Sequence, residues 1–238
     1  MAELILALDL PTRSDAVHLL DRLPALRWVK VGSILMTAEG PGLVRELVAR
    51  GLHVFLDLKW HDIPSTVAGA VRVAAGLGVS MATVHASGGS EMLQAAVGAA
   101  PASLALVGVT VLTSHLQPQS TDFTDSSVSS SSDESVESVD ASLKEQVARL
   151  ARLATEAGLR GVVCSPLEVA RVRAMLAADA LIVVPGIRRA GDDPGDQRRT
   201  ASPAEAIRGG ATHLVVGRPV VQAPDPAAAL EAFLAEIS

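Results

Sequence analysis

Charged residues follow directly on an apolar run in the stretch 53–66, HVFLDLKWHDIPST. Asp57 and Lys59 are two apart, so on a strand their side chains share one face, whereas Asp62 comes after the strand has ended. A carboxylate and an ammonium in a partly dry place keep each other ionised, and an ammonium held in this way is suited to deliver a proton. The alternative is a structural ion pair at the end of a strand.

Two later segments carry residue types that bind phosphate groups. They are 185–199, PGIRRAGDDPGDQRR, and 215–219, VVGRP. Glycine N–H groups, the forked donors of Arg218 and the amide of Gln197 suit a cluster of anionic oxygens. These segments predict a phosphate-bearing substrate, with a basic surface patch as the alternative.

Short apolar runs alternate eight times with longer segments of helical period, the pattern of βα units around a parallel sheet. The predicted strands are 4–8, 28–31, 53–58, 81–85, 104–112, 161–164, 181–184 and 213–216. The predicted helices are 14–23, 41–50, 64–77, 90–99, 141–157, 166–177, 203–208 and 226–236.

Eight units that fill the whole length favour a closed (β/α)₈ barrel, one domain over 1–238, rather than an open doubly wound sheet. In such barrels the chemistry lies where strands end, and the loops after strands seven and eight commonly bind phosphate. The polar residues at or just past the predicted strand ends are Asp9, Lys30, Asp57, Lys59, His85, Thr113, Arg188 and Arg218.

The second predicted strand lies beside the third, so Lys30 is expected to join Asp57, Lys59 and Asp62 in a network of alternating charge. Its alternative is a set of salt bridges that only stabilises the barrel. The combination with phosphate-binding loops favours a site, because sites combine convergent polar groups with a pocket.

Composition narrows the class of protein. Hydrophobic residues make up 49% of the chain, Tyr is absent, and Phe and Trp total five, so the core must be aliphatic. A net charge of −6 argues against nucleic acid or a membrane surface as the main partner. The single Cys164 excludes an internal disulfide and any CxxC metal site, and it fits a cytoplasmic location. The first residues do not read as a signal peptide.

The segment 117–140, QPQSTDFTDSSVSSSSDESVESVD, is rich in Ser and acidic residues. Such a composition buries too little apolar area to offset the entropy of ordering, which predicts a mobile insert after the fifth strand. A solvated loop is the preferred interpretation, and an acidic lid over the site is the alternative.

The motif DLKWHDIP at 57–64 resembles that of the orotidine 5′-phosphate decarboxylases. The resemblance extends over ALD at 7–9, VKVG at 29–32, LTS at 112–114, PGIR at 185–188 and VVGRP at 215–219, in the family's order. It implies cofactor-independent decarboxylation of orotidine 5′-phosphate to UMP in pyrimidine synthesis, with no metal.

The resemblance also implies residue roles. Lys59 would protonate C6 of the pyrimidine, Asp57 would lie against the departing carboxylate, and Lys30 and Asp9 would hold the ribose hydroxyls. Asp62 and Thr66 would reach into the site of a second subunit, which implies a homodimer with shared active sites. The remaining matched positions are Thr113 at the pyrimidine and Arg188, Gln197, Gly217 and Arg218 at the phosphate and the adjoining loop.

Two departures from the family pattern are Ser65, where bacterial members usually have Asn, and the acidic insert. Two other functions stay open. One is a metal-dependent decarboxylase or aldolase acting on a sugar phosphate, with Asp57 and a neighbouring carboxylate holding Mg²⁺. The other is a nucleotide-binding protein without a reaction. His61, His85 and Cys164 are interpreted as scaffold.

Overall fold

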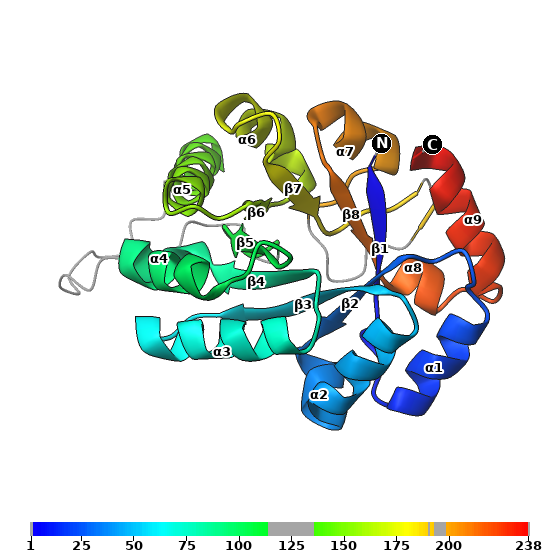
Figure 1. The fold of residues 1–238 in the computed structure, drawn as a ribbon. Helices are drawn as coiled ribbons and strands as arrows, with labels where there is room; N and C mark the ends of the chain where they lie inside the picture. The colour runs from blue at the N-terminus through cyan, green and yellow to red at the C-terminus, as the bar shows by residue number, and fades with distance from the viewer. Residues whose placement is uncertain (1, 114–135, 190, 193–198, 238) are drawn as a thin grey trace, which may run out of the picture.

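Eight parallel strands pair in sequence order and close into a barrel, β1 lying beside β8, with the helices around the outside (Figure 1). The structure is a computed structural model that describes residues 2–113, 136–189, 191–192 and 199–237. The strands are β1 (Glu3–Ala7), β2 (Trp28–Gly32), β3 (His53–Trp60), β4 (Met81–His85), β5 (Ala105–Val109), β6 (Gly161–Val163), β7 (Leu181–Val184) and β8 (His213–Val216). The predicted (β/α)₈ barrel is confirmed.

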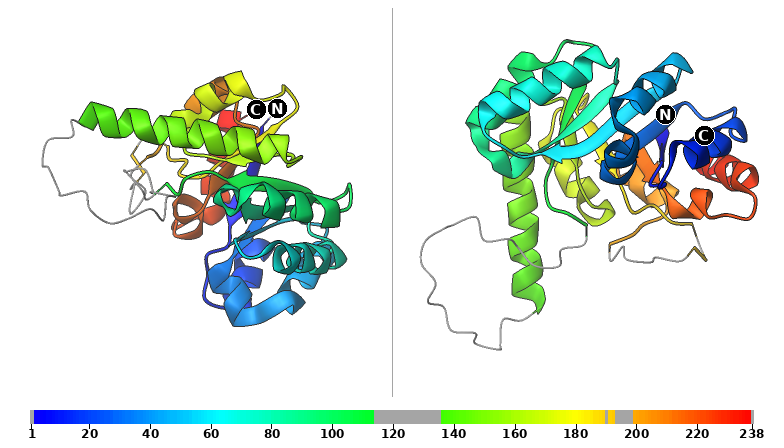
Figure 2. Two further views of the ribbon diagram at one scale, coloured as in Figure 1. Left: turned by 90° about the vertical axis from the view of Figure 1, so that its left-hand side faces the viewer. Right: turned by 90° about the horizontal axis from the view of Figure 1, so that it is seen from below.

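Nine α-helices and two short 3₁₀ turns lie among the described residues. They are α1 (Arg13–Asp21), α2 (Ser33–Ala49), α3 (Pro64–Gly76), η1 (Ala86–Gly88), α4 (Gly89–Ala99), α5 (Val136–Glu156), η2 (Pro166–Glu168), α6 (Val169–Met175), α7 (Pro203–Gly209), α8 (Arg218–Val221) and α9 (Pro226–Ile237). None of the helices in this part of the chain is long and apolar enough to cross a membrane. The two termini lie close together in every view (Figures 1 and 2).

Three helices differ from prediction. Helix α2 begins at Ser33 rather than at residue 41. Residues 33–39 form a first helical half, and Gly40, at φ 65°, connects it to a second half that opens with Pro41. Helix α8 was not predicted, since four residues carry no measurable periodicity.

Helix α5 begins at Val136, inside the predicted insert, and extends beyond its neighbours α4 and α6 (Figure 2). Val136, Val139 and Leu143 continue the helical spacing of the later apolar residues, which accounts for the earlier start. Residues 117–135 of the insert lie outside the described residues.

Apolar side chains fill two layers. The larger packs the outer face of the sheet against the helices, and the smaller fills the barrel interior. As predicted, both are mainly aliphatic. The interior layer consists of Ile5, Ala7, Phe55, Met81, Val107, Val183 and Val215. Strand side chains alternate in direction, so two residues further along the same strands, Asp57 and Thr83 also face inward, toward the carboxyl end of the barrel.

Trp28 lies at the opposite end of the barrel between two histidines. Its ring stacks on His53 at a centroid distance of 4.8 Å and meets His213 edge-on at 5.4 Å. His213 is buried, and its Nδ1 lies 2.9 Å from the Thr212 hydroxyl. Burial lowers the pKa of His213 from 6.5 to about 4.

This histidine makes the barrel less stable in mild acid. Between pH 6.5 and pH 4 the unfolded chain binds a proton at His213 that the folded chain does not, so the free energy of unfolding falls as pH drops through that window. The full difference is on the order of 3 kcal/mol. Urea unfolding at pH 7 and pH 4.5 should show a smaller loss of stability for His213→Gln than for the wild type, and equal losses would contradict the assignment.

Candidate active site

A cavity of about 700 Å³ opens at the carboxyl ends of the strands. It is lined by residues from the ends of β1, β2, β3 and β5 to β8 and the loops that follow them. Most of the residues singled out in the sequence meet here: Asp9, Lys30, Asp57, Lys59, Thr113, Arg188, Gly217 and Arg218. The strand-end rule therefore located the cavity correctly.

Four charged side chains form a row of alternating sign along one wall of the cavity. Lys30 Nζ lies 2.9 Å from Asp9 Oδ1 and 3.6 Å from Asp57 Oδ2. Lys59 Nζ donates to both oxygens of Asp57 at 2.9 Å. The Asp57 and Lys30 side chains are only 12% and 11% exposed, whereas Lys59 is 38% exposed, so the lysine can reach a bound molecule.

The backbone at Lys59 is unusual. Lys59 has φ 51°, the one positive φ at a residue other than glycine in the described chain. The pairing of β3 with β4 shifts register between Leu56 and Trp60, so the strand bulges here. Bulges and left-handed residues other than glycine cost free energy and cluster at functional sites, where they redirect a side chain.

Gly32 allows the Lys30–Asp9 pair to form where it does. A Cβ atom at this position would lie 3.0 Å from Lys30 Nζ and 3.1 Å from Asp9 Oδ1. A larger residue would therefore require the ends of the Lys30 and Asp9 side chains to shift by a few tenths of an ångström. The glycine of the VKVG motif is thus explained by close approach of charged side chains.

The loops after β7 and β8 line another part of the cavity. Arg188 is 9% exposed; its N–H donates to Ala201 O at 3.0 Å, and its Nη1 donates to Ile187 O at 2.8 Å. Arg218 opens the short helix α8 directly after Gly217, and Gly186 in the β7 loop has φ 79°. Two arginines and two glycines therefore lie on this part of the cavity lining, and these residue types are suited to an anionic group. Gln197 lies outside the described residues.

Comparison with known proteins identifies the family of this chain. The model of the orotidine 5′-phosphate decarboxylase / HUMPS family matches residues 2–233. The chain belongs to this family. Proteins named orotidine 5′-phosphate decarboxylase from Moorella thermoacetica and Opitutus terrae are 46% and 48% identical to it; each alignment covers 99% of this chain, and 92% and 98% of the relatives. A crystal structure of orotidine 5′-phosphate decarboxylase from Lactobacillus acidophilus superposes with a TM-score of 0.79 at 35% identity, covering 100% of both chains.

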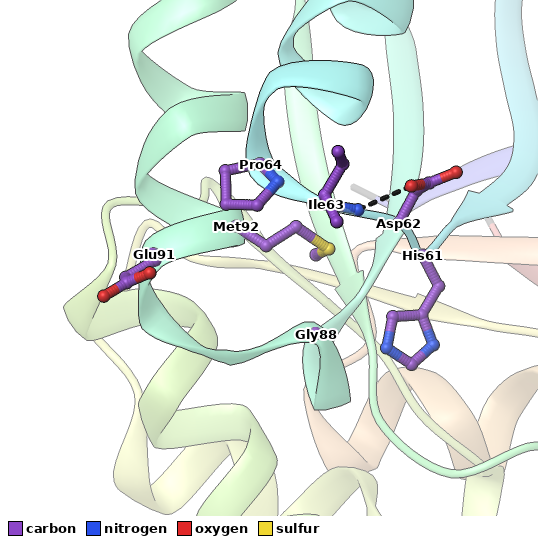
Figure 3. Close-up of a pocket in the computed structure, with 7 residues that line it drawn as sticks. All are labelled: His61, Asp62, Ile63, Pro64, Gly88, Glu91 and Met92. Atoms are coloured by element: carbon purple, nitrogen blue, oxygen red, sulfur yellow. Dashed lines mark hydrogen bonds between the residues drawn. The ribbon is translucent and has the colours of Figure 1, made fainter.

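Asp62 and Thr66, which the resemblance assigns to the site of a second subunit, lie outside the cavity of their own chain. The Asp62 carboxylate accepts a hydrogen bond from the Ile63 N–H at 2.6 Å and borders a separate groove, together with His61, Pro64, Gly88, Glu91 and Met92 (Figure 3). Thr66 is exposed in the first turn of α3. The predicted network of four therefore has Asp9 in place of Asp62 within one chain.

The histidines and the cysteine are held by their surroundings. His85 Nδ1 lies 2.6 Å from the Ser87 hydroxyl, and its ring stacks on His61 at 5.4 Å. Cys164 lines the cavity but is buried, and burial raises the pKa of its thiol well above the usual range. A thiol held protonated in this way is a poor nucleophile.

Sequence reasoning missed a buried ion pair behind the cavity. Arg199 Nη1 donates to Glu168, and both side chains are at most 5% exposed. Arg199 Nη2 also donates to Leu112 O at 3.0 Å, while Glu168 accepts from the Ser165 N–H at 2.9 Å. The pair connects three loops, because Leu112 follows β5, Glu168 follows β6 and Arg199 follows β7. The SPLE sequence at 165–168 is a capping-box signature that marked Glu168, but a partner 31 residues away leaves no local signal.

Among the described residues, no group of three or more His, Cys, Asp or Glu side chains is placed to hold a metal ion. The metal-dependent alternative requires a second carboxylate beside Asp57. The charged groups that lie against Asp57 are instead the ammonium groups of Lys30 and Lys59. A carboxylate already paired with two ammonium groups is poorly suited to bind a cation.

Proposed function

We propose that the protein decarboxylates orotidine 5′-phosphate to UMP and CO₂, in de novo pyrimidine synthesis and in the cytoplasm. The observation that carries the proposal is the row Asp9–Lys30–Asp57–Lys59 beside a wall with two arginines in one cavity of about 700 Å³. A cavity of this volume suits a small-molecule ligand such as a nucleotide. Family membership and the names of the relatives support the same substrate.

Lys59 is the proposed proton donor. Loss of CO₂ from C6 leaves an electron pair in an sp² orbital that the pyrimidine ring cannot delocalise. An ammonium already held in place by Asp57 stabilises the developing negative charge without reorganisation and then protonates the carbon. The deprotonated Lys59 regains its proton from solvent, to which its side chain is open.

Asp57 is proposed to lie against the substrate carboxylate. Two anions in contact repel each other, and this repulsion is relieved when CO₂ departs. Asp57 also orients Lys59 through two hydrogen bonds. Both effects involve the carboxylate oxygens of Asp57. Both require that the Asp57 carboxylate stays in place while the substrate loses its own carboxylate.

The reaction is proposed to need no cofactor, with fixed charge taking its place. General acid catalysis alone contributes roughly 10²–10⁴-fold in rate, so preorganised electrostatics and remote binding energy must supply most of the rest. Lys30 and Asp9 are proposed to hold the ribose, Thr113 the pyrimidine, and Arg188, Gln197, Gly217 and Arg218 the phosphate. These groups bind the parts of the substrate that do not react.

Removal of Arg218 should affect both binding and turnover. Arg218→Ala is expected to raise KM and to lower kcat, because phosphate binding energy is used to hold the reacting end of the substrate in place. Steady-state kinetics should show a loss in kcat/KM of about 10- to 1000-fold. Arg208→Ala is the matched control, since this arginine lies in the last turn of α7 and does not line the cavity. Unchanged kinetics for Arg218→Ala would remove it from the phosphate site.

One assay tests the proposed function as a whole. The purified protein is mixed with orotidine 5′-phosphate in EDTA, and the loss of orotidylate absorbance is followed. Turnover in the chelator is the expected result. Loss of activity in EDTA, or turnover of a sugar phosphate instead, would favour the metal-dependent alternative, and tight UMP binding without turnover would favour a binding protein.

The active form is proposed to be a homodimer in which Asp62 and Thr66 enter the site of the second subunit. Asp62 lies just before α3 and Thr66 in its first turn, both outside the cavity of their own chain, and Ile63 between them is 64% exposed. Contact with a second subunit there would bring a third acid, Asp62 of the partner subunit, to the charge row.

A further inference from the structure

Thr83 lies directly behind the charge row. It is fully buried at the centre of β4, and it is not among the residues that line the cavity. Its hydroxyl accepts a hydrogen bond from the Lys59 backbone N–H at 2.8 Å and donates one to Asp57 Oδ1 at 3.1 Å. A hydroxyl has a single proton to donate, so with the Lys59 N–H as donor on one side, its proton is committed to Asp57 on the other.

The position of Thr83 in the sheet explains these contacts. Leu56 pairs with Ala82 and Trp60 pairs with Val84, so three residues of β3 stand opposite the single residue Thr83 of β4. The ladder cannot satisfy every backbone group across such a bulge. The Thr83 side chain supplies the partner for the Lys59 N–H at the point where Lys59 takes up its left-handed conformation.

The contacts form a closed ring through the proposed catalytic pair. From the Lys59 backbone it passes through the Thr83 hydroxyl to the Asp57 carboxylate, and from there to Lys59 Nζ. Thr83 therefore holds both ends of the lysine, the backbone directly and the amine through Asp57. Catalytic groups need to be held within about 0.5 Å of productive geometry by supporting hydrogen bonds.

We propose that Thr83 is a positioning residue that sets the Lys59 amine and the Asp57 carboxylate for proton delivery. The proposal rests on the proposed function. Thr83 does not touch the substrate, and it acts on the two groups that face the departing carboxylate. UMP lacks this carboxylate, so loss of the Thr83 hydroxyl should slow turnover while leaving UMP binding intact.

Thr83→Val tests the role because it keeps the shape of the side chain and removes both hydrogen bonds. The expected result is a fall in kcat of about 10- to 100-fold, the effect of one or two hydrogen bonds to charged or strained groups. The Kd for UMP, measured by calorimetry, should stay within about twofold of the wild type. Thr83→Ser restores the hydroxyl and should return kcat to within about threefold.

Thr110→Val is the matched control. Thr110 is equally buried at the end of β5, and its hydroxyl donates to Val163 O, which also accepts from the Thr110 N–H. Its variant should turn over substrate like the wild type. Should Thr83→Val fail to fold, the pair Thr83→Ala and Thr83→Ser, which differ by one oxygen atom, answers the same question.

The outcomes separate the two proposals. A wild type that leaves orotidine 5′-phosphate unchanged overturns the proposed function. A wild type that turns over substrate, with a folded Thr83→Val variant of equal kcat, overturns the positioning role alone. That role also fails if UMP binding weakens in step with kcat, or if Thr83→Ser is as slow as Thr83→Val.

Discussion

Lys59→Ala is expected to lose at least about 10⁴-fold in kcat, because one substitution removes both the proposed proton donor and the positive charge proposed to lie beside C6. The barrel should stay folded. Lys59 is 38% exposed, and Asp57 keeps Lys30 at 3.6 Å and the Thr83 hydroxyl at 3.1 Å as partners. Circular dichroism, thermal unfolding and a sensitive turnover assay measure the two expectations separately.

Two further variants sharpen this test. Lys59→Arg keeps the positive charge, but a guanidinium does not give up its proton readily, so turnover should stay low. Lys144→Ala removes a lysine from α5, away from the cavity lining, and should leave turnover unchanged. Near-normal turnover in folded Lys59→Ala would rule out the role proposed for this lysine.

Mixing two inactive variants should restore activity if subunits share active sites. In a dimer of one Lys59→Ala chain and one Asp62→Ala chain, both substitutions fall in one site and the other site is intact. Random reassortment of equal amounts should therefore recover about a quarter of wild-type activity. The mixture is unfolded and refolded together, and turnover is compared with that of each variant alone.

The matched control for mixing is Lys59→Ala with Asp57→Ala. These two residues belong to the same chain's cavity, so every mixed dimer carries a defect in both sites and the mixture should stay inactive. Activity of the first mixture no greater than the sum of its parts would show that Asp62 acts within its own chain or not at all.

The fold was accessible from the sequence because each βα unit has a local signature and eight units leave room for few architectures. The cavity followed from one further rule, that strand ends carry chemistry, which brought together Asp9, Lys30, Asp57 and Lys59. Helix α2 was predicted too short because Pro41 marks the second half of a helix kinked at Gly40.

Other parts of the site depend on distances that the sequence does not contain. The bulge at Lys59 is a property of the β3–β4 register, so alternation alone could not show that Thr83 would stand opposite three residues. The Glu168–Arg199 pair joins residues 31 positions apart. Asp62 was grouped with Lys59 because the two are close in sequence, yet the turn at Ile63 directs the carboxylate away.

The chain has two tryptophans and no tyrosine, and the two indoles lie at opposite ends of the barrel, Trp28 at the start of β2 and Trp60 at the end of β3. Its intrinsic fluorescence is therefore the sum of two well-separated emitters. With Trp28→Phe, the remaining emission comes from Trp60, the neighbour of Lys59 in the chain. With Trp60→Phe, it comes from an indole that lies against both His53 and His213, so the emission reports on the amino end of the barrel.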